Sequence, residues 1–226
     1  MKLILTCEHA TNLLPSSYHS LFKNEQDLLN THEGFDIGAF EVYKSLQNLA
    51  HYSLHYPWSR LLIEINRSLH HPNLFSIISK KMDKAEKNRI ITNYYEPYRN
   101  QIQQKIKEII DRGEQVLHLS IHSFTPILNG YVRETDLGIL YDPRRNAEKD
   151  WAENFRKELS LQFGQFRIRM NYPYLGKADG FTTSLRTKFP RQYLGIELEI
   201  NQKLFKNLDE TEAFKLKLNQ CLIANL

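Results

Sequence analysis

The sequence has 226 residues, enough for a substantial core, and we expect a single domain over residues 1–226. Its formal net charge of +4 is small and its basic residues are scattered, so the composition gives no reason to expect a nucleic-acid partner. We find no signal peptide and no apolar stretch of the roughly 20 residues that would span a membrane. The only cysteines, Cys7 and Cys221, lie at opposite ends of the chain, so we expect no disulfide and a cytoplasmic location.

The first half of the chain predicts strands and helices in alternation. An apolar run from Leu3 predicts the first strand, and isoleucines spaced along one face between Ile102 and Ile110 predict the longest helix, which ends before Gly113. Pro97 lies inside that helix and marks a separate turn or a kink. The elements predicted here are a strand at 2–7, a polar loop at 12–33, a helix at 35–49, strands at 52–56 and 61–65, and a helix at 88–112.

The second half continues the alternation. The elements predicted here are strands at 115–122 and 135–141, a helix at 148–163, an edge strand at 166–170, a loop at 171–192, a strand at 193–200 and a helix at 210–223. A loop of the length predicted for 171–192 is often functional in a compact domain. Strands that alternate with helices predict the α/β class with a mostly parallel or mixed sheet.

Three of the apolar runs end in residues that bind metals or move protons. The runs end at His9, His122 and Glu199, and each is typical of a buried strand. Open α/β sheets place their ligand sites in a crevice beyond the ends of such strands. The pattern therefore suggests a metal-dependent hydrolase.

Two of these residues, His9 and His122, are candidate metal ligands. Two neutral imidazoles and one carboxylate are a common donor set for catalytic zinc, which leaves the fourth position to a water whose pKa falls to ~7. The third ligand stays open between Asp36, which opens a predicted helix after a glycine, and Glu8, which is adjacent to His9 and should point to the other face of the strand. We place Asp36 ahead of Glu8. His118 shares a strand face with His122 but is more typical of a hydrogen-bonded core histidine.

The last predicted strand carries Glu197 and Glu199 on one face. A carboxylate inside an apolar strand is costly unless it is paired or solvated. Glu199 lies nearer the strand end and is the better candidate for a general base, because burial would raise its pKa toward the useful range. A salt bridge with an arginine is the alternative, and it suits Glu197 better.

Four arginines could supply the remaining chemistry. They are Arg60, Arg67, Arg133 and Arg186. A guanidinium group can clamp a carboxylate through two parallel hydrogen bonds or stabilise an oxyanion. Several arginines near one site suggest an acidic substrate.

Five motifs in order along the chain resemble the N-formylglutamate amidohydrolase family. They are Cys7-Glu-His-Ala-Thr-Asn12 followed by Pro15, Gly34-Phe-Asp-Ile-Gly-Ala39, Ser59-Arg60 leading to Asn66-Arg67, Ile121-His-Ser-Phe-Thr-Pro126, and Glu197-Leu-Glu-Ile-Asn-Gln202. That family is distantly similar to the zinc carboxypeptidases, and the resemblance implies a phosphorylase/hydrolase-like three-layer α/β fold.

The resemblance also implies roles for particular residues. By chain order, His9 and His122 fall on zinc ligands, Asn66-Arg67 on the pair that holds a substrate carboxylate, and Glu199 on the base. Carboxypeptidases take their carboxylate ligand three residues after the first histidine, where this chain has Asn12, so the third ligand stays open.

The hypothesis is a zinc-dependent enzyme, or one using another divalent cation, that hydrolyses the amide of a small anionic N-acyl amino acid, first of all N-formyl-L-glutamate. In it Arg133 helps to polarise the carbonyl, and Arg60 and Arg186 join Asn66 and Arg67 in binding the substrate. Two alternatives remain: a non-catalytic domain of the same fold that binds anionic metabolites, and a hydrolase that uses Cys7 as its nucleophile.

Overall fold

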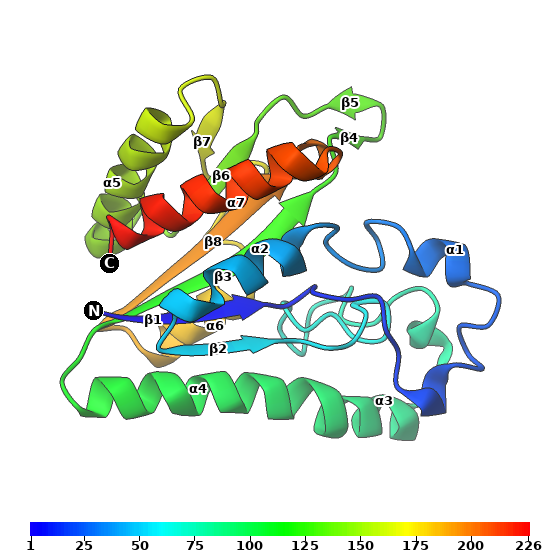
Figure 1. Cartoon of the computed structure of the whole chain (residues 1–226). Helices are drawn as coiled ribbons and strands as arrows, with labels where there is room; N and C mark the ends of the chain where they lie inside the picture. Colours follow the sequence, from blue (N-terminus) through cyan, green and yellow to red (C-terminus); the bar gives the residue numbers. More distant parts are fainter.

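A central sheet of six strands organises the computed structural model, which describes residues 1–226 (Figure 1). The strands are β1 (Lys2–Cys7), β2 (Tyr52–His55), β3 (Val116–Phe124), β6 (Leu137–Leu140), β7 (Ile168–Met170) and β8 (Tyr193–Asn201). Their order is β2-β1-β3-β8-β6-β7. The first four run parallel, β6 pairs with β8 in the antiparallel sense, and β7 is parallel to β6. The sheet is therefore mixed and mostly parallel, which confirms the predicted class.

Helices cover both faces of the sheet and complete three layers (Figure 1). One face carries α2 (Ala39–Leu46), α5 (Asn146–Gln162) and α7 (Leu208–Ile223), and the other carries α3 (Lys84–Ile90), α4 (Glu96–Asp111) and α6 (Phe181–Lys188). The short helix α1 (Gln26–Leu29) lies in the loop after β1, and a small hairpin, β4 (Ile127–Leu128) with β5 (Tyr131–Val132), follows β3. None of the helices combines the length and hydropathy needed to cross a bilayer.

The central strands carry different chemistry on their two faces. Toward α2, α5 and α7 they present an almost wholly apolar set: Leu3, Leu5, Cys7, Leu117, Leu119, Ile121, Leu194, Ile196, Leu198 and Ile200. Because side chains alternate along a strand, the intervening residues face α4 and α6. They include the polar set Thr6, His118, Ser120, His122, Glu197 and Glu199. The polar face continues beyond the carboxyl ends of β1, β3 and β8, where a ligand site is expected.

Several predicted elements have different bounds in the structure. The predicted helix at 88–112 is made of α3, a π-helical turn at Ile91–Tyr95 and α4, and Pro97 lies in the first turn of α4, where it is tolerated. The predicted helix at 35–49 begins only at Ala39 and ends in a 3-10 turn at Gln47–Leu49. The loop predicted at 171–192 contains α6.

The strand predicted at 61–65 is wrong. These residues form turns outside the sheet, where Leu62 N donates to Ser59 O and Glu64 N donates to Leu74 O. The apolar residues of the run are buried in the core between the sheet and α4, so the run is apolar because it is buried and not because it is paired in a strand. Glu64 interrupts the run because its side chain turns toward the polar end of the sheet, as the contacts of His9 show.

Candidate metal centre and adjoining cavity

Two histidines and one aspartate converge at the carboxyl ends of β1 and β3, with His122 within the last residues of β3 and His9 just after β1. His122 Nδ1 lies 3.0 Å and His9 Nδ1 lies 3.4 Å from the same oxygen, Asp36 Oδ2. One donor atom from each of the three residues lies within 4.8 Å of the others, and all three side chains are buried. Donors about 2.0–2.1 Å from one tetrahedral zinc ion would lie ~3.4 Å apart, so the cluster fits a divalent cation with little movement.

The backbone holds this cluster together. His9 comes two residues after β1, and its carbonyl oxygen accepts a hydrogen bond of 2.9 Å from Asp36 N. Asp36 Oδ2 also accepts from Ser123 N at 3.1 Å, which ties the carboxylate to the end of β3. Asp36 lies three residues before α2, and its carbonyl accepts from Ala39 N. Asp36 thus bridges β1 and β3 at their carboxyl ends.

A further carboxylate contacts the second ring nitrogen, Nε2, of each imidazole. His9 Nε2 lies 2.5 Å from Glu64 Oε1, and His122 Nε2 lies 3.3 Å from Glu8 Oε2. An Nε2–H that donates to a carboxylate leaves the Nδ1 lone pair free for a metal, as metal-bound histidines commonly arrange it. Glu8 therefore lies behind His122, while Asp36 lies between the imidazoles.

The charges of the cluster are also those of a cation site. Burial disfavours the imidazolium of His122, but hydrogen bonds and charge from Asp36 and Glu8 outweigh it and raise the pKa of His122 well above its usual value. Burial likewise favours a neutral Asp36, but the charges of His9 and His122 and their hydrogen bonds hold its pKa well below the usual range. Without a cation, protons on the imidazoles neutralise the buried carboxylates. The donor types and the excess negative charge both fit a metal ion.

Glu199 lies beside this cluster on β8, opposite His122 in the strand register. Its side chain is buried and Oε2 has no hydrogen-bond partner. Burial, together with the negative charges of Asp36 and Glu197, raises the pKa of Glu199 to about 8, against a lowering by His122. An unpartnered buried carboxyl group of this kind is typical of a functional site.

The cluster opens into a cavity of about 290 Å³. Its lining residues are His9, Asp36, Arg60, Asn66, Arg67, His122, Ser123, Tyr174, Leu175, Ala178, Asp179, Glu197 and Glu199. This volume is at the lower end of the range for ligand pockets and suits a small molecule. The cavity therefore brings together seven of the nine residues predicted for the site.

The two arginines in the cavity differ in their partners. Arg60 forms salt bridges to Asp36 at 3.3 Å and to Glu64 at 2.5 Å, so its charge is already matched. Arg67 forms no salt bridge, and its Nη1 donates to the backbone carbonyl of Asp179. Asn66 Oδ1 accepts from Phe181 N at 2.7 Å, which leaves its amide nitrogen available.

Arg133 and Arg186 do not line the cavity. Arg133 is 7% exposed and lies behind Tyr174, whose hydroxyl is 3.4 Å from its Nη1. Arg186 donates from Nε to Glu148, from Nη1 to Gly176 O and from Nη2 to Gly195 O. Through these hydrogen bonds Arg186 links the loop before α6 to β8. Each of its three guanidinium nitrogens already has a partner, so none is free to bind a substrate.

Two other candidates belong to the core. Cys7 is fully buried on the opposite face of the sheet, and burial raises the pKa of its thiol well above the usual value, which disfavours a nucleophilic thiolate. His118 is held between Thr6 Oγ1 at 2.8 Å and the Tyr193 hydroxyl at 2.7 Å, as expected of a hydrogen-bonded core histidine.

The structure adds residues that the sequence did not single out for the site. In the sequence, Glu64 stands out only as a charged residue inside an apolar run. A buried carboxylate in such a run could have indicated a functional role. Asp179 and Tyr174 lie in the loop before α6, where nothing in the sequence distinguishes them. Their place in the cavity follows from the path of that loop.

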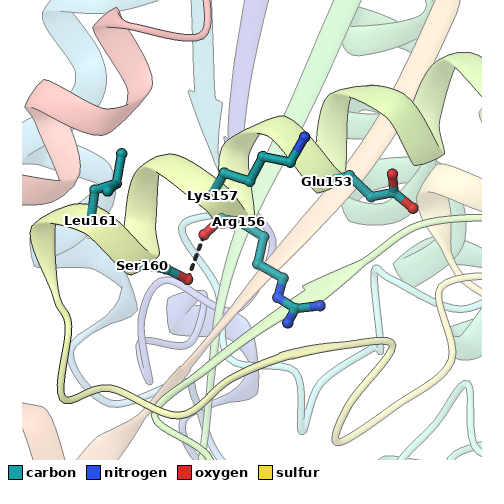
Figure 2. A pocket seen from close by; sticks show the side chains of 5 residues that line it. All are labelled: Glu153, Arg156, Lys157, Ser160 and Leu161. Atoms are coloured by element: carbon teal, nitrogen blue, oxygen red, sulfur yellow. Dashed lines mark hydrogen bonds between the residues drawn. The ribbon is translucent and has the colours of Figure 1, made fainter.

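A second hollow lies on the outer face of α5 (Figure 2). Its residues are Glu153, Arg156, Lys157, Ser160 and Leu161. All come from one helix and their side chains diverge, while the Ser160 hydroxyl donates to the Arg156 carbonyl at 2.8 Å. No convergent chemical groups line it, so the cavity beside His122 is the candidate functional site.

Comparisons with known proteins agree on a family and a fold. A family model described as N-formylglutamate amidohydrolase matches residues 1–206. A gene product from Agrobacterium tumefaciens has a similar structure, with a TM-score of 0.83 at 27% identity over 99% of this chain and 91% of that chain. N-formylglutamate amidohydrolase from Ralstonia eutropha JMP134 gives a TM-score of 0.76 at 16% identity over 99% and 92%. A comparison with curated proteins finds no significant match.

Proposed function

The chain belongs to the N-formylglutamate amidohydrolase family, and we propose that it uses a divalent metal ion to hydrolyse the amide bond of a small N-acyl amino acid. One observation carries the proposal: His9, Asp36 and His122 converge on one point beside the unpartnered carboxyl group of Glu199. Metal ligands and a proton carrier in one small cavity are the groups that metal-assisted hydrolysis of an amide uses.

His9, Asp36 and His122 would hold the cation. Two imidazoles and one carboxylate favour zinc, although other divalent metals accept the same donors. When bound, such a cation polarises a carbonyl and acidifies water. Glu8 and Glu64 orient the two imidazoles from behind, at 3.3 and 2.5 Å.

Glu199 is proposed to carry the proton. The pKa of Glu199 is about 8 in the metal-free protein and a nearby cation would lower it, so the carboxyl group can exist in both protonation states near neutral pH. That property suits a group that takes a proton from water and then passes it to the leaving amine. Because Glu199 is 4% exposed, few bulk waters compete for its proton.

Arg67 and Asn66 are proposed to bind the carboxylate of the amino acid. Arg67 has no salt bridge and the Asn66 amide nitrogen is available, so both can donate to a carboxylate in the cavity. Arg60 is matched by two carboxylates and contributes less. Arg133 would act on the carbonyl only if Tyr174 moved, so that role stays a prediction.

The test combines metal analysis with an assay for formate. Protein purified without chelators should carry about one divalent metal per chain and release formate from an N-formyl amino acid, with N-formyl-L-glutamate assayed first because the family is named for it. Chelation should abolish the activity and zinc should restore it. Full activity in metal-free protein would contradict the metal part of the proposal.

A non-catalytic binding domain is the weaker alternative. It would need Arg67 and Asn66 but would gain nothing from a buried carboxyl group without a partner, because such a group destabilises the fold. Failure to hydrolyse any of a panel of N-acyl amino acids, with metal bound, would favour it.

A further inference from the structure

Glu197 is a carboxylate of the cavity wall without a cationic partner. Its side chain is half-buried on β8, and the salt bridge that its place in the sequence suggested does not form. Its Oε1 accepts a hydrogen bond of 2.5 Å from the hydroxyl of Thr182, in the first turn of α6. An ionised carboxylate accepts several hydrogen bonds, so Glu197 can also bind a donor group of a ligand in the cavity.

Glu197 neighbours both the proposed proton carrier and the proposed carboxylate anchor. Glu199 lies on the same face of β8, two residues further on, at about 7 Å along the strand. A Cβ atom built on Gly180 would lie 3.5 Å from Asn66 Oδ1 and 3.6 Å from Glu197 Oε1, so these two oxygens flank the same glycine. A small ligand can therefore contact Asn66, Glu197 and Glu199 at once.

This arrangement matches the groups of an α-amino acid. The nitrogen and the carboxylate of an amino acid are attached to the same carbon atom, so a nitrogen lies next to any carboxylate that Arg67 and Asn66 bind. Glu197 lies beside Asn66 and is an acceptor of the correct charge for a nitrogen that donates hydrogen bonds. The cavity is thus complementary to both charged ends of a free amino acid, whatever its side chain.

The proposed reaction changes the charge of that nitrogen. The water oxygen bonds to the acyl carbon, and the C–N bond breaks with its electron pair left on nitrogen. Both protons of the water end on the amine, the first of them carried by Glu199. The neutral amide nitrogen therefore leaves as an ammonium group, and a fixed carboxylate beside it stabilises this charge as it develops.

We infer that Glu197 binds the nitrogen of the amide that is hydrolysed. It accepts a hydrogen bond from the amide N–H of the substrate and forms an ion pair with the ammonium group of the amino acid product. The inference rests on the proposed function and adds a second carboxylate to it: Glu199 delivers the proton, and Glu197 stabilises the nitrogen that receives it.

The test compares the binding of L-glutamate with that of glutarate, which differs only in lacking the amino group. Kd values are measured by calorimetry on zinc-loaded wild type and Glu197→Gln. The wild type should bind L-glutamate at least about tenfold more tightly, because hydrogen bonds between charged groups are the strong ones. In Glu197→Gln the preference should fall to about twofold or less. Equal binding of the two compounds by the wild type, or no binding of L-glutamate, would overturn the inference.

Thr182→Val is the matched control. Glu197→Gln keeps a carbonyl oxygen for the Thr182 hydroxyl but removes the charge, whereas Thr182→Val removes that hydrogen bond and keeps the charge. Thr182→Val should therefore retain most of the preference for L-glutamate, and both variants should bind as much zinc as the wild type. An equal loss of the preference in both variants would show that Glu197 acts only by positioning α6, and would overturn the inference.

Turnover provides an independent measurement. Glu197→Gln should lower kcat for N-formyl-L-glutamate by about tenfold with a smaller change in KM, since a carboxylate binds an ammonium group more strongly than a neutral amide N–H. An unchanged kcat would exclude Glu197 from the chemical step. Absence of formate release by the wild type would instead count against the proposed function, because the binding preference is measured on compounds that are not hydrolysed.

Discussion

Glu8 and Asp36 contact opposite nitrogens of the same imidazole, that of His122. Glu8 Oε2 lies 3.3 Å from Nε2, and Asp36 Oδ2 lies 3.0 Å from Nδ1. Burial alone would raise the pKa of Glu8, but the hydrogen bond and charge of His122 lower it to about 2, so Glu8 stays anionic. The ring is thereby held with Nδ1 turned toward His9.

Replacement of Glu8 by glutamine should weaken zinc binding. Loss of a carboxylate behind a metal-bound histidine lowers affinity by about 10–100-fold, because the ring loses orientation and basicity. Competition with a chromophoric chelator measures the effect. Glu114→Gln is the control, because Glu114 is a partly exposed residue that pairs with Lys2 at the start of β1, away from the metal ligands. Equal zinc affinity in Glu8→Gln and the wild type would refute this role.

Replacement of Glu199 by glutamine should stop catalysis without removing the metal. Loss of a general base and acid lowers kcat by about 10²–10⁴-fold. Zinc content should stay at the wild-type level, since Glu199 is not among the three converging ligands. Steady-state formate release and metal analysis on one preparation give both values. A variant with nearly normal kcat would exclude Glu199 as the proton carrier.

The same variant should alter the pH dependence of stability in metal-free protein. The pKa of Glu199 is about 8 in the folded state against 4.5 for an ordinary glutamate. Between these values the folded protein keeps a proton that the unfolded chain releases, so the contribution of Glu199 to stability falls as pH rises. Glu199→Gln removes this loss and should be the more stable protein at pH 8, by up to a few kcal/mol.

Urea unfolding at several pH values, in the presence of a chelator, measures this difference. The histidines titrate in both the wild type and Glu199→Gln. The difference in free energy of unfolding between the two proteins therefore reports on Glu199 alone. The curves of the two proteins should converge as pH falls toward 4.5. A constant difference across the whole range would contradict the raised pKa.

Loss of the Tyr95 hydroxyl should weaken substrate binding through Arg67. The hydroxyl donates to the Arg67 carbonyl at 2.6 Å, and Arg99 donates to the same carbonyl at 3.4 Å. Tyr95→Phe removes one hydrogen bond, worth about 1 kcal/mol, and frees the backbone of the proposed anchor. We expect KM to rise several fold with little change in kcat. Tyr94→Phe is the control, and an equal effect in both variants would show that Tyr95 acts only on stability.

The sequence predicted the layout of the fold because alternation along a strand is a local property. His118 and His122 share a face, as do Glu197 and Glu199, and the structure shows both pairs on the polar side of the sheet. The predicted family is confirmed by the match over residues 1–206. The place of the site could also be predicted, because the carboxyl ends of parallel strands meet at one edge of the sheet and ligands bind there.

Contacts made by irregular segments could not be predicted. Asp36 reaches His122 because its own N–H bonds to the His9 carbonyl, a tertiary contact with no sequence signature. The run at 61–65 was misassigned because burial in a loop and burial in a strand produce the same apolar pattern. The sequence offered Arg186 and Arg67 as equal candidates for binding a substrate. Only the structure shows that Arg186 already forms a salt bridge with Glu148.

The π-helical turn at Ile91–Tyr95 couples two distant contacts. Upstream of it, Glu86 accepts from the Tyr18 hydroxyl at 2.7 Å; at its end, Tyr95 reaches Arg67. A π-helical turn has i→i+5 hydrogen bonds and so holds one residue more than an α-helical turn; loss of one residue here would close the segment into a continuous α-helix and keep the orientation of its two halves. Deletion of Thr92 or Asn93 should therefore be tolerated, whereas deletion of Asn88, in α3, would rotate Tyr95 by ~100° relative to Glu86 and break one of the two contacts, a difference that thermal unfolding of the two shortened proteins would measure.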